Sequence, residues 1–314
     1  MSPPAGPSPA SPSRPAAADV PVRLPAKQLL SAYVALTKPR IIELLLVTTV
    51  PTMVVAARGL PSGWLVLATL VGGALAAGGA NAMNMVVDRD IDAIMHRTRH
   101  RPLVTGAMSP RAALVFALSL EVVAFLELWL AVNLLSAVLA VSATAFYVLV
   151  YTLWLKRTSS QNIVIGGAAG AVPVLVGWSA VTDHLGLAPL VLFGVIFVWT
   201  QPHFWALAVR YRDDYAAADV PMLPAVSSLT RTATQILAYS VALWALSLVL
   251  VPVAHMGLIY LASATVLGAV FCAYAVRVRL SATPRTAMRL FTFSISYLTL
   301  LFSAMAVDQL IHIR

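Results

Sequence analysis

Asn84-Met85-Val86-Val87-Asp88-Arg89-Asp90-Ile91-Asp92 stands at the end of a long apolar run, and the basic tract Arg97-Thr98-Arg99-His100-Arg101-Pro102-Leu103 follows it. If the apolar run is a helix that continues through this stretch, Asn84, Asp88 and Asp92 recur every four residues. They then lie on one face, about 40° apart around the axis and about 6 Å apart along it, whereas Asp90 points elsewhere. The stretch therefore predicts a helix face that carries one amide and two carboxylates.

This face indicates a bound cation, because two stacked carboxylates at the end of an apolar helix repel each other and lose hydration. Oxygen ligands select a hard ion, and Mg²⁺ held by one or two carboxylates takes its remaining ligands from water and substrate phosphate. Arg97 and Arg101 can bind the same phosphates. The alternative is a solvated helix end whose acids pair with neighbouring arginines. The combined spacing of acids and arginines favours the magnesium site.

Composition places the chain in a membrane. Of its 314 residues, 60% are hydrophobic and 11% charged, and the mean hydropathy is +0.86, values typical of an all-α polytopic membrane protein. The net charge of +9 comes from basic residues dispersed between apolar spans, so it indicates lipid headgroups and not nucleic acid. The lone Cys272 permits no intrachain disulfide.

The chain divides into a tail and one membrane domain. Residues 1–28 are rich in Pro, Ala and Ser and predict a disordered tail. Residues 29–314 form the membrane domain. Apolar stretches of about 17 to 25 residues predict nine transmembrane helices, at 41–57, 64–86, 110–130, 132–155, 161–182, 188–209, 232–253, 257–276 and 290–311.

The distribution of basic residues predicts the orientation. With the N-terminus in the cytoplasm, 19 of the 21 Lys and Arg residues lie on the cytoplasmic side, and only Arg58 and Arg314 lie outside. The positive-inside rule is therefore satisfied, and the C-terminus is predicted outside. The expected location is the plasma membrane of a bacterium.

A second acidic stretch, Arg210-Tyr211-Arg212-Asp213-Asp214-Tyr215, lies in another long cytoplasmic loop, four helices after the first. Its position suggests two related four-helix halves. Neither Asp213 nor Asp214 lies on the same helix face as Asp219. An ordinary network of surface arginines and acids is the alternative to a functional site, and the position relative to Asp88 and Asp92 favours function.

Other polar residues within the spans leave alternatives open. Glu121 and Glu127 lie six apart in the third span and indicate either a proton path or a local structural role. His203 lies among aromatic residues in Trp199-Thr200-Gln201-Pro202-His203-Phe204-Trp205. A histidine in such a place is either a hydrogen-bonded core residue or a contact for a flat aromatic substrate.

Taken together, these motifs resemble the UbiA superfamily of intramembrane prenyltransferases, and their combination resembles its haem branch. The resemblance covers nearly all of the chain after the tail. It rests on Leu36–Leu44, Asn84–Leu103, Gln161–Gly167, Trp199–Trp205 and Asp213–Pro224.

This resemblance implies nine helices around a central cavity and Mg²⁺-dependent transfer of a farnesyl group from farnesyl diphosphate to a vinyl group of haem B, giving haem O. Haem A synthase is a candidate partner enzyme. The implied metal ligands are Asn84, Asp88, Asp92, Asp213 and Asp214, of which the first three are also the implied catalytic residues. The implied diphosphate-binding residues are Lys38, Arg97 and Arg101, and the implied haem contacts are His203 and Trp199.

Two other functions are compatible with parts of the pattern. Another UbiA enzyme, acting on a quinone precursor or a chlorophyll-type ring, would share the acidic motifs and differ in its acceptor pocket. A secondary transporter would place charged residues and broken helices near the midplane. The acidic motifs here lie at one edge, which favours the enzyme.

Overall fold

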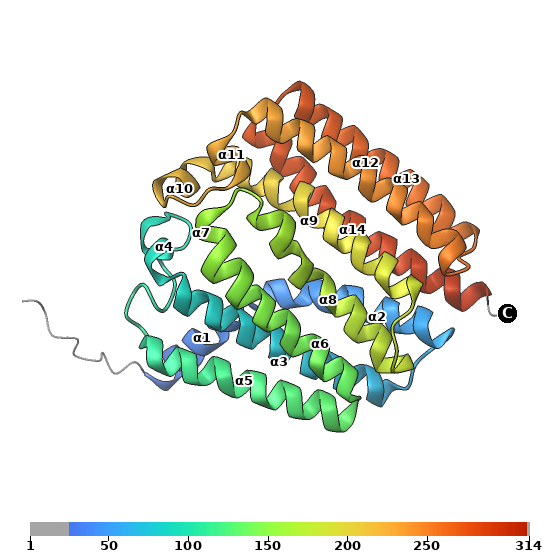
Figure 1. The fold of residues 1–314 in the computed structure, drawn as a ribbon, viewed down its shortest axis with the longest axis horizontal. Coiled ribbons are helices and arrows are strands. Elements are labelled where there is room, and N and C mark those ends of the chain that lie inside the picture. Colours follow the sequence, from blue (N-terminus) through green and yellow to red (C-terminus); the bar gives the residue numbers. More distant parts are fainter. Residues whose placement is uncertain (1–24, 313–314) are drawn as a thin grey trace, which may run out of the picture.

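The computed structural model describes residues 25–312, and that part of the chain contains helices and no strands (Figure 1). The all-α prediction is therefore confirmed. The elements are α1 Ala26–Thr37, α2 Pro39–Ala57, α3 Gly63–Val87, α4 Arg89–Ile94, α5 Pro110–Ala131, α6 Leu134–Ala145, a π-helical segment η1 Phe146–Leu155, α7 Lys156–Thr158, α8 Asn162–Thr182, α9 Leu187–Arg210, α10 Arg212–Ala217, α11 Leu223–Val226, α12 Leu229–Val253, α13 Leu258–Leu280 and α14 Pro284–His312.

Within residues 25–312, eight helices are long and apolar enough to cross a membrane. The predicted number was nine, and the difference is the first span. That span corresponds to α2, in which the apolar stretch Val47–Ala57 of the described residues is shorter than a full span. The other eight predicted spans each correspond to one long helix. The central cavity implied by the resemblance stays a prediction.

The third and fourth spans separate at Asn133. Its side-chain Oδ1 accepts a hydrogen bond from the Ser136 backbone N at 2.8 Å, and this cap starts α6. The fourth span then runs unbroken through α6, η1 and α7, from Leu134 to Thr158. Hydropathy gives no sign of the π-helical part, which widens the turn where the span approaches the acidic motif.

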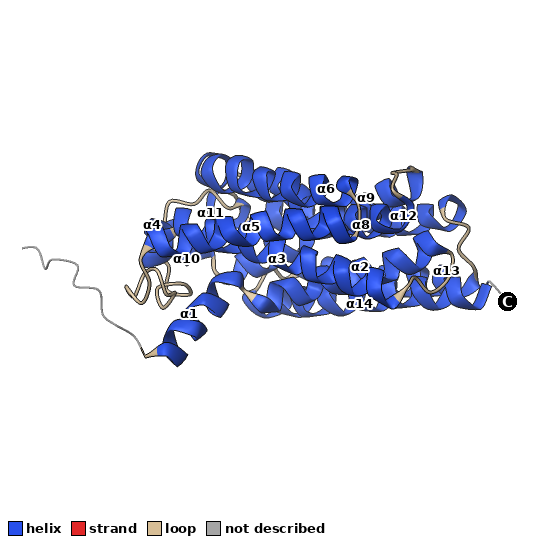
Figure 2. Cartoon of the chain, turned by 90° about the horizontal axis from the view of Figure 1, so that it is seen from below, coloured by secondary structure: helices blue, strands red, loops and turns tan. Residues whose placement is uncertain are grey.

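The long helices run side by side and form one bundle (Figures 1 and 2). The short elements α4, α7, α10 and α11 gather at one end of it, and the described C-terminal end lies at the opposite end. Helix α1 lies obliquely beside the end that carries the short elements. It begins at Ala26, inside the predicted tail, whose residues 1–24 lie outside the described residues, as does Arg314.

Two buried acidic side chains connect different helices. Glu121 of α5 is buried against α3, where a side chain at Gly79 would collide with it, and its Oε1 accepts a hydrogen bond from Thr144 Oγ1 at 3.1 Å. This contact supports the structural role of Glu121. At the opposite end of the bundle, buried Asp308 of α14 accepts backbone hydrogen bonds from Gly257, Ile259 and Tyr260, and so caps α13.

Candidate active site

The first acidic motif lies on one continuous helical path. The Asp88 backbone N donates to the Asn84 carbonyl at 2.9 Å, and the Asp92 backbone N donates to the Asp88 carbonyl at 2.8 Å. Helical hydrogen bonding therefore continues across the short break between α3 and α4. Asn84, Asp88 and Asp92 are 3%, 0% and 2% exposed, whereas the Asp90 side chain is 64% exposed. The helical spacing predicted this division.

Three basic side chains, here called the cation collar, contact the buried face of Asn84, Asp88 and Asp92. Lys156 Nζ forms an ion pair with Asp88 Oδ2, Arg101 NH1 contacts Asp92 Oδ2 at 2.5 Å, and Lys38 Nζ donates to Asn84 Oδ1 at 2.8 Å. Burial, followed by the nearby charges of Arg101 and Lys156, lowers the pKa of Lys38 to about 7. The two buried carboxylates are therefore paired with basic side chains that are largely shielded from solvent.

Two members of this site were not singled out from the sequence. Lys156 lies 68 residues after Asp88, and Thr152, one turn earlier in the π-helical segment, accepts a hydrogen bond from Asn84 Nδ2 at 3.1 Å. Basic residues at a cytoplasmic helix end are ordinary, so Lys156 carried no distinguishing signal. The neighbouring Arg157 instead binds exposed Asp90 through two contacts of 2.7 Å.

The second acidic motif reaches the loop that follows the first. Asp214 of α10 accepts a hydrogen bond from the Arg97 backbone N at 3.2 Å, and the Arg97 guanidinium lies 5.3 Å from the centre of the Tyr211 ring. A shared apolar cluster that includes Ile91 and Tyr215 packs the two segments together. The structure thus brings Asp214 to the loop that follows the first motif, whereas Asp213 and Asp219 are exposed.

The first motif offers oxygen ligands of the kind that Mg²⁺ prefers. Asp88 Oδ1 is buried and has no hydrogen-bond partner among the described residues, so one carboxylate oxygen is available to a cation. No group of three His, Cys, Asp or Glu side chains in residues 25–312 is close enough to hold one metal ion. A single ion here fits one or two carboxylates and substrate oxygens, and not all four motif acids together.

His203 and Trp199 lie together on α9, apart from the acids. Their rings stack at 4.3 Å, and His203 also stacks on Phe291 at 4.6 Å. Ser294 Oγ donates to the Phe291 carbonyl at 2.6 Å, so it accepts from His203 Nδ1–H, also at 2.6 Å. This arrangement leaves the lone pair of His203 on Nε2.

The bundle of long apolar helices defines a multi-pass membrane protein, and the buried carboxylate face with its basic neighbours lies at one end of it. The UbiA prenyltransferase family model matches residues 45–300. The chain belongs to that family.

Relatives and solved structures agree with this assignment. A protoheme IX farnesyltransferase of Frankia alni is 56% identical over 284 residues, which cover 89% of this chain and 98% of the relative. A digeranylgeranylglyceryl phosphate synthase structure superposes with a TM-score of 0.74 at 16% identity, covering 90% of this chain and 99% of that one. A UbiA homologue from Archaeoglobus fulgidus, bound to DMAPP and Mg²⁺, gives 0.61 at 17% identity, covering 88% and 99%. At these identities the two structures establish the fold.

Proposed function

We propose that this protein transfers the farnesyl group of farnesyl diphosphate to a vinyl group of haem B and so makes haem O. The observation that carries the proposal is the 56% identity to a protoheme IX farnesyltransferase over 89% of this chain. The buried carboxylate face with its cation collar supports this proposal.

In the proposed mechanism, Asp88 and Asp92 would hold Mg²⁺, with Asn84 as a further oxygen ligand. The ion supplies charge stabilisation for the diphosphate leaving group. The unpartnered Oδ1 of Asp88 supports this assignment, because a buried carboxylate oxygen without a partner is costly. Asp214 and Asp213 then act from the second loop, as ligands of a separate ion or by holding the Arg97 loop.

Lys38, Arg101 and Lys156 are the proposed diphosphate contacts, and Arg97 approaches from the adjoining loop. In the structure, Arg101 and Lys156 pair with the two carboxylates that the metal would occupy. When a metal takes those carboxylates, both side chains become available to an anion at the same position. Metal binding and diphosphate binding should therefore support each other.

His203 and Trp199 are the proposed haem contacts. The Ser294 hydroxyl orients the imidazole and leaves Nε2 as the candidate ligand atom, and stacking between Trp199 and Phe291 holds the ring in place. The apolar walls of the predicted central cavity would also keep water from intercepting an allylic cation. The final addition of water to the farnesylated vinyl group has no residue assigned to it.

The proposed setting is the plasma membrane of a bacterium, with the acidic end of the bundle in the cytoplasm. The 19 basic residues on that side support this orientation. Haem A synthase, which would use the product, is the proposed partner enzyme.

The test uses purified protein with Mg²⁺, farnesyl diphosphate and one acceptor at a time, followed by mass spectrometry. One vinyl group of haem B should become a hydroxyethylfarnesyl group by addition of farnesyl and hydroxyl, and neither an aromatic quinone precursor nor a chlorophyll-type ring should be prenylated. Prenylation of one of those acceptors, with haem B unchanged, would assign another reaction of the family.

A further inference from the structure

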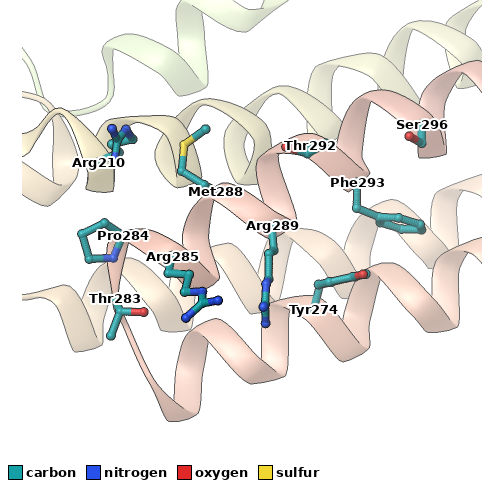
Figure 3. Close-up of a pocket in the computed structure, with 10 residues that line it drawn as sticks. All are labelled: Arg210, Tyr274, Thr283, Pro284, Arg285, Met288, Arg289, Thr292, Phe293 and Ser296. Atoms are coloured by element: carbon teal, nitrogen blue, oxygen red, sulfur yellow. The ribbon is translucent and has the colours of Figure 1, made fainter.

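A hollow of about 940 Å³ lies away from the acidic face, between the ends of α9, α13 and α14 (Figure 3). Arg210 reaches it from α9 and Tyr274 from α13, and the first three turns of α14 supply most of the remaining wall. Since Arg210 immediately precedes the second acidic loop, the hollow lies at the same end of the bundle as the proposed active site.

The hollow is strongly basic. Arg210, Arg285 and Arg289 line it, and no Asp or Glu does. All three arginines are exposed, and none of them forms an ion pair within the described residues 25–312. Three guanidinium groups around one hollow repel one another, and an anion between them would relieve that repulsion.

A polar stripe on α14 extends from the arginines toward the membrane interior. Arg285, Arg289, Thr292 and Ser296 lie at helical spacing on one exposed face, which extends about 16 Å along the axis. Neither hydroxyl makes a hydrogen bond within the described residues. Polar groups on the outer face of a membrane helix favour a ligand that brings acceptors with it.

The wall beside this stripe is apolar. Met288 and Phe293 of α14 line the hollow, and the Phe293 ring stacks on Tyr274 at 5.0 Å. The matching ligand therefore has an anionic head, acceptor oxygens a few ångströms deeper, and an apolar body.

We propose that this hollow binds one anionic glycerophospholipid of the surrounding bilayer. Its phosphate lies among Arg210, Arg285 and Arg289, its ester carbonyls accept from Thr292 and Ser296, and an acyl chain lies along Met288 and Phe293. The end of the bundle that carries these arginines is at headgroup level, where anionic lipid is abundant.

Haem propionates are the other anions to consider, and the geometry favours the lipid. On α14, Phe291 and Ser294, which contact His203, lie about 100° to 160° around the axis from the stripe of Arg289, Thr292 and Ser296. On α14, the arginine stripe and the proposed haem contacts therefore face in different directions.

The experiment measures lipid retention by native mass spectrometry. Delipidated protein is incubated with equal amounts of phosphatidylglycerol and phosphatidylcholine. Wild type should retain phosphatidylglycerol preferentially, and the Arg285→Gln/Arg289→Gln variant should bind it on the order of tenfold more weakly. The matched control Arg231→Gln/Arg279→Gln removes two exposed charges that do not line the hollow and should retain the preference.

Two further variants separate the parts of the proposal. Thr292→Val should weaken both lipids by a smaller, similar factor, because both carry ester groups. Met288→Trp fills the hollow without removing charge and should also reduce retention, which tests the site even if the double arginine variant folds poorly.

If the Arg285→Gln/Arg289→Gln variant and the control variant lose phosphatidylglycerol equally, binding depends on general surface charge and the proposed lipid site is wrong. The proposal also fails if the Arg285→Gln/Arg289→Gln variant loses haem B binding, followed by the Soret band, while its lipid retention is unchanged.

Discussion

Replacing Lys156 by glutamine removes the cation that pairs with Asp88 and leaves that carboxylate 0% exposed. Loss of one partner from a buried ion pair costs about 3 to 5 kcal/mol. The lower end applies, since Asn84 Nδ2 still donates to the same Asp88 oxygen at 2.7 Å and the Lys156 side chain is 14% exposed. We therefore expect the metal-free variant to be about 3 kcal/mol less stable, with a melting temperature on the order of 5 to 10 °C lower.

Magnesium should restore most of this loss. An ion bound only by the folded state, at a concentration one hundred times its dissociation constant, stabilises by about 2.7 kcal/mol. In wild type the gain should be smaller, because the positive charge of Lys156 on Asp88 Oδ2 repels an ion bound at Oδ1. Thermal unfolding in detergent, with a chelator and then with Mg²⁺, measures both effects.

Arg157→Gln is the matched control. It removes the same charge at the next position, but its partner Asp90 is 64% exposed, so the pair contributes about 1 kcal/mol or less. Equal melting shifts for the two variants, or a Lys156→Gln variant that Mg²⁺ does not stabilise further, would refute the idea that lysine and metal compete for Asp88.

Three further predictions address other parts of the molecule. His203→Ala should weaken haem B binding and leave farnesyl diphosphate binding nearly unchanged in equilibrium titrations; the reverse result would remove His203 from the acceptor site. Asp308→Ala should lower the melting temperature with no selective effect on either substrate. Three backbone N–H groups at the start of α13 lose their hydrogen-bond acceptor in this variant, at a cost of about 0.5 to 2 kcal/mol. An unchanged melting temperature would contradict this role. Single cysteines at exposed Arg99 and Asp219 should react with a membrane-impermeant thiol reagent only after the cytoplasmic side is opened, and labelling of both in intact cells would overturn the orientation.

The sequence was sufficient for the helical class and for the acidic face, because both depend on local periodicity. A four-residue spacing fixes which side chains share a helix face once the helix continues, and the backbone hydrogen bonds at Asp88 and Asp92 continue it. The exposed position of Asp90 follows from the same rotation.

The partners of that face could not be predicted, since they depend on tertiary packing. Lys38 and Lys156 lie 46 and 68 residues from the groups they contact, and nothing in their local sequence separates them from other basic residues near a membrane. Helix α1 was missed because its 12 residues are too short for a span. Spacing also could not distinguish Asp214, which reaches the Arg97 loop, from exposed Asp213.

Turnover of haem B to haem O tests most directly whether the buried carboxylates form the proposed active site of a haem farnesyltransferase. With Mg²⁺ and farnesyl diphosphate present, Asp88→Asn and Asp92→Asn should each lower turnover by at least about two orders of magnitude, the effect of losing one preorganised electrostatic contact. Asp90→Asn should retain most of the activity, and a chelator should abolish it in wild type. Full turnover by folded, membrane-inserted Asp88→Asn and Asp92→Asn protein would contradict the account.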